Sequence, residues 1–330
     1  MINVRSLNSI TSHRLASEIV ALFYIVAVVG MAVTIGPFYL LFPELGALSY
    51  DGLGRPHGRW CRAPLHLATS PALAGVIGLI ITRHFSYGLP ALLLDAAGVM
   101  ILIEVLQSPI APAISAGLLP LVLGIKSWWY PPGILLGSVL LTALAIPWKR
   151  FSLTTWPEVD VAPAAEGEPS PPFLRRLGII LAFTVVAALA VMVTGLRFIL
   201  FPPLLVIAYE MFGHPDSCPW ALKPMRLPLV CTLTAAAGFA FYQLFGVGPA
   251  AAACSMAAGM LILRIFELHI PPALAVALLP MAIESPTIAY PLAVGIGTSL
   301  LSICFLAYSK LSGGVMEQIF YSLRDRLGIR

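Results

Sequence analysis

The chain has 330 residues, of which 59% are hydrophobic and only 10% are charged, and its formal net charge is +4. A water-soluble domain carries roughly 25% charged residues, so this composition excludes an ordinary soluble protein. The apolar residues come in runs of about 20, the length at which a helix crosses a bilayer. The sequence therefore predicts an all-α, multi-pass membrane protein whose main partner is the lipid bilayer.

The same composition narrows the partners and cofactors. The basic residues are not gathered with aromatic or polar readers on a soluble face, so no nucleic-acid partner is expected. The five cysteines are scattered without a CxxC pair, and we expect them to form neither a metal site nor a disulfide. No cofactor is expected, and a homo-oligomer is compatible with the sequence.

In chain order, Arg5 and Arg14 come before an apolar run from about Ala16 to Phe42. A cleavable signal peptide has an apolar region of only about 7–15 residues. We therefore expect the first span to be retained, with the N-terminus in the cytoplasm.

The next feature is an internal duplication. "LLFPELGALSYDGLGRP" at residues 40–56 matches "ILFPPLLVIAYEMFGHP" at 199–215, a shift of 159 (199 − 40). "IAPAISAGLLP" at 110–120 matches "IPPALAVALLP" at 270–280, a shift of 160 (270 − 110), and a Tyr-Pro pair recurs at Tyr130 and Tyr290. A nearly constant shift over this much sequence predicts two tandem copies of one membrane unit.

Each copy contains the same series of apolar segments. In the first copy they lie at about 16–33, 34–50, 64–83, 88–106, 111–124 and 130–148, and in the second at about 177–194, 197–212, 228–246, 248–267, 271–283 and 287–309. We therefore divide the chain into membrane repeat 1 (1–148), a polar cytoplasmic linker (149–176), membrane repeat 2 (177–309) and a cytoplasmic tail (310–330). The tail places Ile319, Phe320, Leu323 and Leu327 on one helical face, as an amphipathic interfacial helix would.

Six crossings per repeat put both termini and the linker on one side of the membrane. That side then holds 15 of the 19 basic residues, the bias expected of the cytoplasmic side. The repeats would be parallel, related by an axis along the membrane normal. If 111–124 and 271–283 turned back without crossing, the repeats would instead be inverted. The bias favours the parallel alternative. We expect the protein to lie in a bacterial inner membrane.

The segments 111–124 and 271–283 are too short to cross alone. A helix over 271–283 is about 20 Å long, and the hydrocarbon core is about 30 Å thick. Proline suits the first turn of a helix because that turn needs no N–H donor. "SPIAPA" and "HIPPA" therefore predict broken helices whose N-terminal N–H groups point to the midplane, where they could bind an anion. The residues assigned to this substrate site are Ser108, Pro109, Pro112, Ala113, His269, Pro271, Pro272, Ala273 and Leu274. The alternative is that these prolines only kink helices and help them to pack.

The stretch "RIFELHIPPALAVALLP" at 264–280, with the loop "GHPDSCPWALKP" at 213–224, resembles the HPP family of integral membrane proteins. Ile270 separates His269 from the two prolines here, and Pro109 stands at the matching position of the first repeat. The resemblance implies a unit of four spans and a short helix in each half, and transport of an anion such as nitrite.

Ionisable groups within apolar segments are functional candidates by default. We assign proton coupling to Asp95, Glu104 and His269, with the alternatives that Asp95 is a hydrogen-bonded structural acid and that His269 caps backbone carbonyls. Arg264 and Glu267, three residues apart, are expected to form a structural pair. The group Arg55, Arg59 and Arg62 is expected to hold lipid headgroups.

These observations favour a transporter or channel for a small solute, with an inorganic anion as one candidate. A non-catalytic scaffold or assembly protein is the main alternative. A membrane-embedded enzyme is a weaker one, because no GxSxG, HExxH or P-loop pattern is present. We therefore expect no enzymatic activity.

Overall fold

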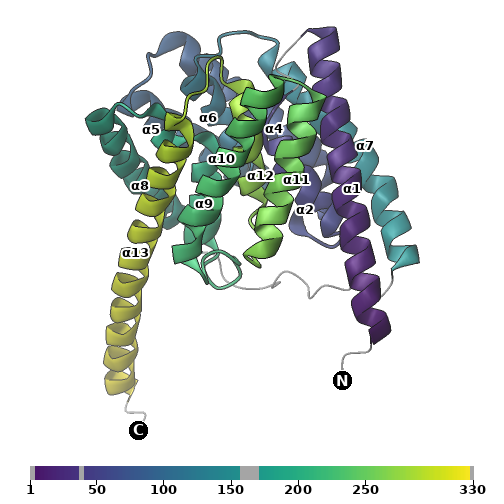
Figure 1. The fold of residues 1–330 in the computed structure, drawn as a ribbon. Helices are drawn as coiled ribbons and strands as arrows, with labels where there is room; N and C mark the ends of the chain where they lie inside the picture. Colours follow the sequence, from purple (N-terminus) through teal and green to yellow (C-terminus); the bar gives the residue numbers. More distant parts are fainter. Residues whose placement is uncertain (1–3, 37–40, 157–170, 328–330) are drawn as a thin grey trace.

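A computed structural model describes residues 4–36, 41–156 and 171–327, which form helices joined by short loops (Figure 1). The first half contains α1 (Val4–Ile35), α2 (Glu44–Gly54), α3 (Arg59–Arg62), α4 (Pro64–His84), α5 (Leu89–Leu106), α6 (Ala113–Leu123) and α7 (Tyr130–Thr155). The second half contains α8 (Phe173–Thr194), η2 (Arg197–Leu200), α9 (Pro202–Gly213), η3 (Pro224–Arg226), α10 (Leu227–Phe245), α11 (Pro249–Ile265), α12 (Pro271–Leu278), η4 (Leu279–Ala282) and α13 (Ala289–Leu327). The protein is therefore an all-α membrane protein, as the sequence predicts.

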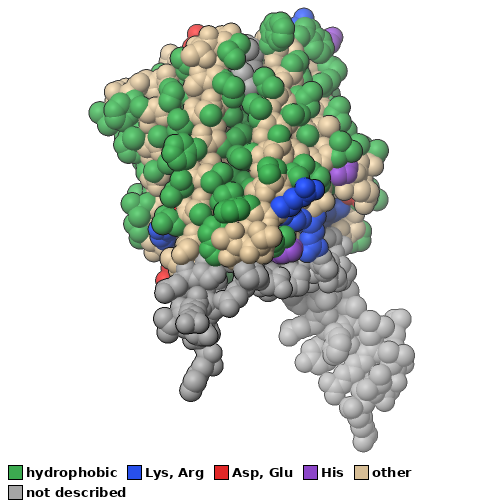
Figure 2. All heavy atoms as spheres, turned by 90° about the vertical axis from the view of Figure 1, so that its right-hand side faces the viewer, with side chains coloured by type: hydrophobic (Ala, Val, Ile, Leu, Met, Phe, Trp, Pro, Cys, Tyr) green, Lys and Arg blue, Asp and Glu red, His purple; other side chains and the backbone are tan. Residues whose placement is uncertain are grey.

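Seven helices of the described chain are long and apolar enough to cross a membrane: Thr11–Ile35, Pro64–His84, Leu89–Leu106, Tyr130–Thr155, Phe173–Thr194, Pro224–Phe245 and Ala289–Leu311. Many of their large apolar side chains face outward, as a lipid-facing surface requires (Figure 2). Proline occupies the first or second position of α4, α5, α7 and α9 to α12, where the missing N–H costs no hydrogen bond.

The two halves pack internally in the same way. In the first half α4 contacts α6 and α7, and in the second half α10 contacts α12 and α13. The same atoms meet at equivalent places: Tyr130 Oη donates to the Ala116 carbonyl and Tyr290 Oη to the Val276 carbonyl, both at 2.6 Å. Gly78 lies against the Gly117 carbonyl and Gly238 against the Ala277 carbonyl. These contacts repeat with the 160-residue shift seen in the sequence.

Both halves also run in the same direction. The ends of α4, α6 and α8 meet at one end of the bundle, where Arg83 Nη1 donates to the Lys126 carbonyl and Arg197 Nη2 to the Leu121 carbonyl. We call this the upper end, after its place in Figure 1. The two chain ends lie at the other, lower end. The chain path corresponds to the parallel alternative.

Contacts between the halves are reciprocal. α1 packs against α11, and its equivalent α8 packs against α5. Likewise α2 packs against α12, and its equivalent α9 packs against α6. Reciprocal contacts of this kind are expected when two halves are related by a two-fold axis. Four short helices, α2, α6, α9 and α12, therefore lie at the centre of the bundle, and we call them the central half-helices.

Two expected boundaries differ from those observed. The linker expected at 149–176 is helical at both flanks, since α7 extends to Thr155 and α8 begins at Phe173; residues 157–170 lie outside the described residues. The tail expected as a separate helix from residue 310 is continuous with α13 as far as Leu327. No proline interrupts residues 310–327, so no N–H donor is missing from the helix there. The side chains of the expected amphipathic face lie outside the described residues.

Candidate functional site

The central half-helices begin inside the bundle. α6 and α2 have 11 residues each and α9 has 12, so each is about 16–18 Å long, roughly half the thickness of the hydrocarbon core. The first turns of α2 and α6 meet, because Ser115 Oγ donates to Glu44 Oε1. The chain therefore breaks near the middle of the bundle, close to the positions that the prolines predict for α6 and α12.

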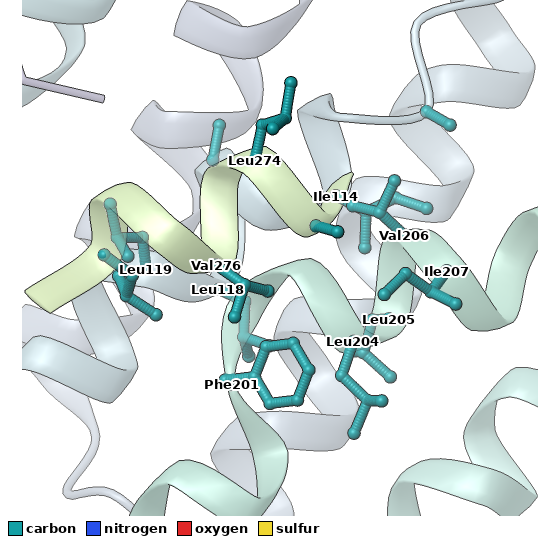
Figure 3. Close-up of a cluster of buried hydrophobic side chains, with 14 of the residues drawn as sticks. Ile114, Leu118, Leu119, Phe201, Leu204, Leu205, Val206, Ile207, Leu274 and Val276 are labelled. Atoms are coloured by element: carbon teal, nitrogen blue, oxygen red, sulfur yellow. The ribbon is translucent and has the colours of Figure 1, made fainter. Parts of the chain in front are cut away.

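Two of the N–H groups at these helix starts already have backbone acceptors. The Ala113 N–H donates to the Ile110 carbonyl at 3.1 Å, and the Ala273 N–H donates to the Ile270 carbonyl at 3.0 Å. The turns that precede the helices are tight enough to supply these acceptors, which the proline spacing alone does not reveal. The surroundings are also apolar. Figure 3 shows buried side chains from three of the helices and from the residue before α9: Ile114, Leu118 and Leu119 of α6, Phe201 before α9, Leu204 and Leu205 of α9, and Leu274 and Val276 of α12.

Two buried acids accompany the first half's break. Glu44 is 1% exposed; one carboxylate oxygen accepts from Ser115, and the other has no described partner. Asp95 in α5 is 1% exposed, and neither of its carboxylate oxygens has a hydrogen-bond partner among the described residues. An Asp95 oxygen lies 3.4 Å from the position a Cβ would take on Gly117, so this acid faces α6.

The second half lacks these acids. Pro203 and Ser255 stand where Glu44 and Asp95 stand in the first half, with shifts of 159 and 160. Ala275 replaces Ser115. The two halves therefore differ chemically, because these two buried acids belong to the first half alone.

A cavity of about 710 Å³ opens at the upper end, between the two halves. Its wall contains residues 122–125 and their equivalents 282–285, so matching segments of the two halves border the cavity. Its polar lining includes Arg197, Lys126, Tyr130, Tyr242 and Glu284. A volume of about 300–1,000 Å³ is typical of small-molecule sites.

Arg197 is the most constrained cation of this cavity. Its guanidinium stacks over the Tyr87 ring at 4.0 Å and donates to the Leu121 carbonyl at 2.6 Å, while Nε is buried without a described partner. Leu119, which lines the cavity, is one helical turn from Ser115, a rise of about 6 Å. The cavity therefore ends close to the buried Glu44.

At the lower end, three side-chain pairs join the first half to the second; we call them the charged pairs, since each contains at least one ionised carboxylate. Arg176 Nη2 lies 2.7 Å from Glu104 Oε2, Arg264 Nη2 bonds to Glu18 Oε2, and His269 Nε2 lies 2.9 Å from Asp51 Oδ1. Glu104 and Arg264 are equivalent positions with opposite charges, and their partners lie on the equivalent helices α8 and α1. The halves are thus joined at this end by two ion pairs of reversed polarity and by the Asp51–His269 pair.

His269 is held by a small network. Its ring stacks on Tyr50 at 5.2 Å, and Arg55 Nε donates to the same Asp51 oxygen at 2.7 Å. Burial lowers the pKa of His269 from its ordinary value of 6.5, and the hydrogen bond with Asp51 opposes this shift. A neutral ring whose Nε2–H donates to Asp51 fits this arrangement.

The expected Arg264–Glu267 pair is not formed, and Arg264 binds Glu18 instead. The reason is local: α11 ends at Ile265, and Glu267 has a left-handed backbone with φ of 50°. The three-residue spacing therefore does not place the two side chains on one helical face.

The other sequence-derived site residues are distributed over the loops and first turns. Ser108 Oγ is 2.8 Å from Ser70 Oγ, in the loop before α6. Pro112, Ala113, Pro271, Pro272, Ala273 and Leu274 are buried, and Pro109 is partly buried. None of them lines the 710 Å³ cavity, so their contact with a substrate stays a prediction.

Sequence reasoning missed Glu44, Asp51, Glu18 and Arg197 as site residues. Two signs were available: Glu44 interrupts an apolar run at "FPEL", and Asp51 recurs as Glu210 in the second repeat. Within the described residues, no group of three or more His, Cys, Asp and Glu side chains is close enough to hold a metal ion.

Comparison of the chain with protein-family models, with curated protein sequences and with solved structures finds no match in any of the three.

Proposed function

We propose that the protein is a carrier that moves a small solute across the membrane by opening its two ends in turn. The observation that carries this proposal is the contrast between the ends. A cavity of about 710 Å³ separates the halves at the upper end, while three charged pairs join them at the lower end. Two repeats that rock against each other around a central site are a known basis of alternating access.

We propose an anion as the solute. Arg197 and Lys126 supply positive charge to the cavity, and Tyr242 adds an aromatic ring with a hydroxyl group. Arginine is well suited to planar anions because its guanidinium presents donors in a fixed fork. The resemblance to the HPP family, which implies transport of an anion such as nitrite, points in the same direction.

We further propose that protons couple to this transport through the first half. Glu44 and Asp95 are buried and have carboxylate oxygens without described partners, and such acids inside a membrane protein are candidates for proton relays. Glu104 and His269 belong to the charged pairs of the lower end, so their part would be to open and close that end. The excess of basic residues among the loops of the lower end favours its placement in the cytoplasm.

The test is flux in liposomes. The purified protein would be reconstituted and supplied with nitrite, nitrate, chloride or bicarbonate, with and without a pH gradient. We expect flux for at least one anion and at least tenfold less with Arg197→Gln, which removes a charge-assisted contact. Arg83→Gln is the matched control, because Arg83 is exposed at the same end and does not line the cavity. Absence of anion flux with the unmodified protein would reject the proposal.

The apolar packing around the helix starts favours a second candidate, a membrane scaffold without turnover. A scaffold would show no flux, and Arg197→Gln would alter only its stability. A membrane enzyme would form product in detergent, without a sealed vesicle. The same preparations therefore separate the three functions.

A further inference from the structure

A second cavity lies within the first half. It has a volume of about 350 Å³ and is formed where α3 and the start of α4 face the C-terminal half of α7. Its lining combines the cations Arg62, Lys149 and Arg150 with Leu67, Ala145 and Ile146. All of these residues belong to the first half, so this groove is separate from the proposed transport path.

The three cations lie at the depth of lipid headgroups. Lys149 is 19 residues after the start of α7 at Tyr130 (149 − 130), a rise of about 28 Å, close to the thickness of the hydrocarbon core. Tryptophans stand at both ends of this stretch of α7: Trp128 and Trp129 are exposed before its start, and the partly buried Trp148 precedes Lys149. Tryptophan is enriched at both membrane–water interfaces.

The apolar part of the groove continues toward the middle of the membrane. Thr142, Ala145 and Ile146 precede Lys149 on α7 by one to two turns, and Ile146 is 45% exposed. Figure 2 shows Lys and Arg side chains gathered near the lower edge of a largely apolar surface. The described lining of the groove includes no acidic side chain. The groove therefore presents positive charge at the interface and an apolar track directly beneath it.

We propose that this groove binds an anionic phospholipid. The phosphate would contact Lys149 and Arg150, and an acyl chain would lie along Ala145 and Ile146. Basic pockets between transmembrane helices on the cytoplasmic side commonly bind such headgroups. A free phosphate group would bind the cations but would leave the apolar track empty. The experiment therefore also compares the lipid with a phosphate compound that has no acyl chain.

The experiment is native mass spectrometry of the full chain, delipidated in detergent and titrated with phosphatidylglycerol or phosphatidylcholine of identical acyl chains. We expect phosphatidylglycerol to bind at concentrations at least about tenfold lower than phosphatidylcholine. Lys149→Gln with Arg150→Gln should raise the phosphatidylglycerol concentration needed by about 25-fold, since each basic residue near an anionic lipid contributes about fivefold. The charge-preserving variant, Lys149→Arg with Arg150→Lys, should stay within about twofold of the unmodified protein.

The matched control is Lys223→Gln with Lys310→Gln, which removes two exposed positive charges from the second half. It should leave phosphatidylglycerol binding within about twofold, because neither residue lines the groove. Equal losses in the control and groove variants would overturn the proposal. Equal affinity for the two lipids would also overturn it. So would full displacement of the lipid by glycerol 3-phosphate, which has the phosphate group but no acyl chains.

Discussion

At the scale of single residues, Glu44 occupies the most consequential position. It begins α2 and accepts a hydrogen bond from Ser115 at the start of α6. The equivalent position of the second half has no acid. One of its oxygens has no described partner although the residue is buried. A group in this place is costly to maintain, which is a physical reason to connect it with proton movement.

Glu44→Gln should uncouple transport from the pH gradient. The amide keeps an oxygen that can accept from Ser115 but cannot exchange a proton, so we expect flux that no longer changes with the gradient. The melting temperature in detergent should change little. Glu284→Gln is the control, because Glu284 also borders the cavity but is exposed. Gradient-driven flux of normal size in Glu44→Gln would remove Glu44 from the coupling scheme.

His269 makes a second prediction, about pH and stability. Burial lowers its pKa in the folded protein, so the unfolded chain binds more protons as the pH falls through about 6.5. Acidification from about pH 7.5 to about pH 5.5 should therefore destabilise the unmodified protein more than His269→Gln. Melting temperatures measured across this range test the difference. Identical slopes for the two proteins would show that His269 does not titrate in this way.

At the scale of elements, the positions of the half-helices follow from the sequence. The segments expected at 111–124 and 271–283 appear as α6, Ala113–Leu123, and as α12 with η4, Pro271–Ala282. Proline fixes where each helix can begin, and the lengths fall short of a membrane span. Proline positions and segment lengths are local features, which is why the sequence alone predicts these half-helices.

The partners of the charged residues could not be predicted in the same way. The sequence pairs Arg264 with Glu267, three residues away, yet Arg264 binds Glu18, which is 246 residues distant. His269 pairs with Asp51 across 218 residues. These contacts depend on how the two halves exchange helices, and no local pattern carries that information. The cavity at the upper end arises from the same arrangement.

Two glycines in α4 and α10 test the repeated packing. A Cβ on Gly78 would lie 1.8 Å from the Gly117 carbonyl oxygen, and one on Gly238 would lie 1.9 Å from that of Ala277. Backbone cannot move aside cheaply, so Gly78→Ala and Gly238→Ala should each destabilise the fold by about 1–3 kcal/mol. Thermal unfolding in detergent measures the effect.

Gly178→Ala provides the control, because this helical glycine has no atom within 4 Å of the added Cβ. It should leave the melting temperature unchanged or raise it, since alanine is the better helix former by up to about 1 kcal/mol. If Gly78→Ala and Gly238→Ala behaved like this control, the close approach of α4 to α6 and of α10 to α12 would be wrong.

At the scale of the whole molecule, the two halves enclose space at one end and are joined by charge at the other. The pairs Glu104–Arg176 and Glu18–Arg264 have reversed polarity at equivalent places. In both pairs the first half supplies the acid and the second half supplies the base, so each contact is balanced in charge. Such pairs are easily separated and remade when water reaches them, as a gate requires.

The central claim is that the lower end must open for transport to occur. The most direct measurement introduces Glu18→Cys and Arg264→Cys into a chain whose five native cysteines are replaced by alanine, and then joins the two new thiols with a short, reducible bis-methanethiosulfonate in liposomes. Flux would be compared before cross-linking, after it, and after reduction. The account predicts that cross-linking stops anion flux and that reduction restores it. Undiminished flux through fully cross-linked protein would contradict it.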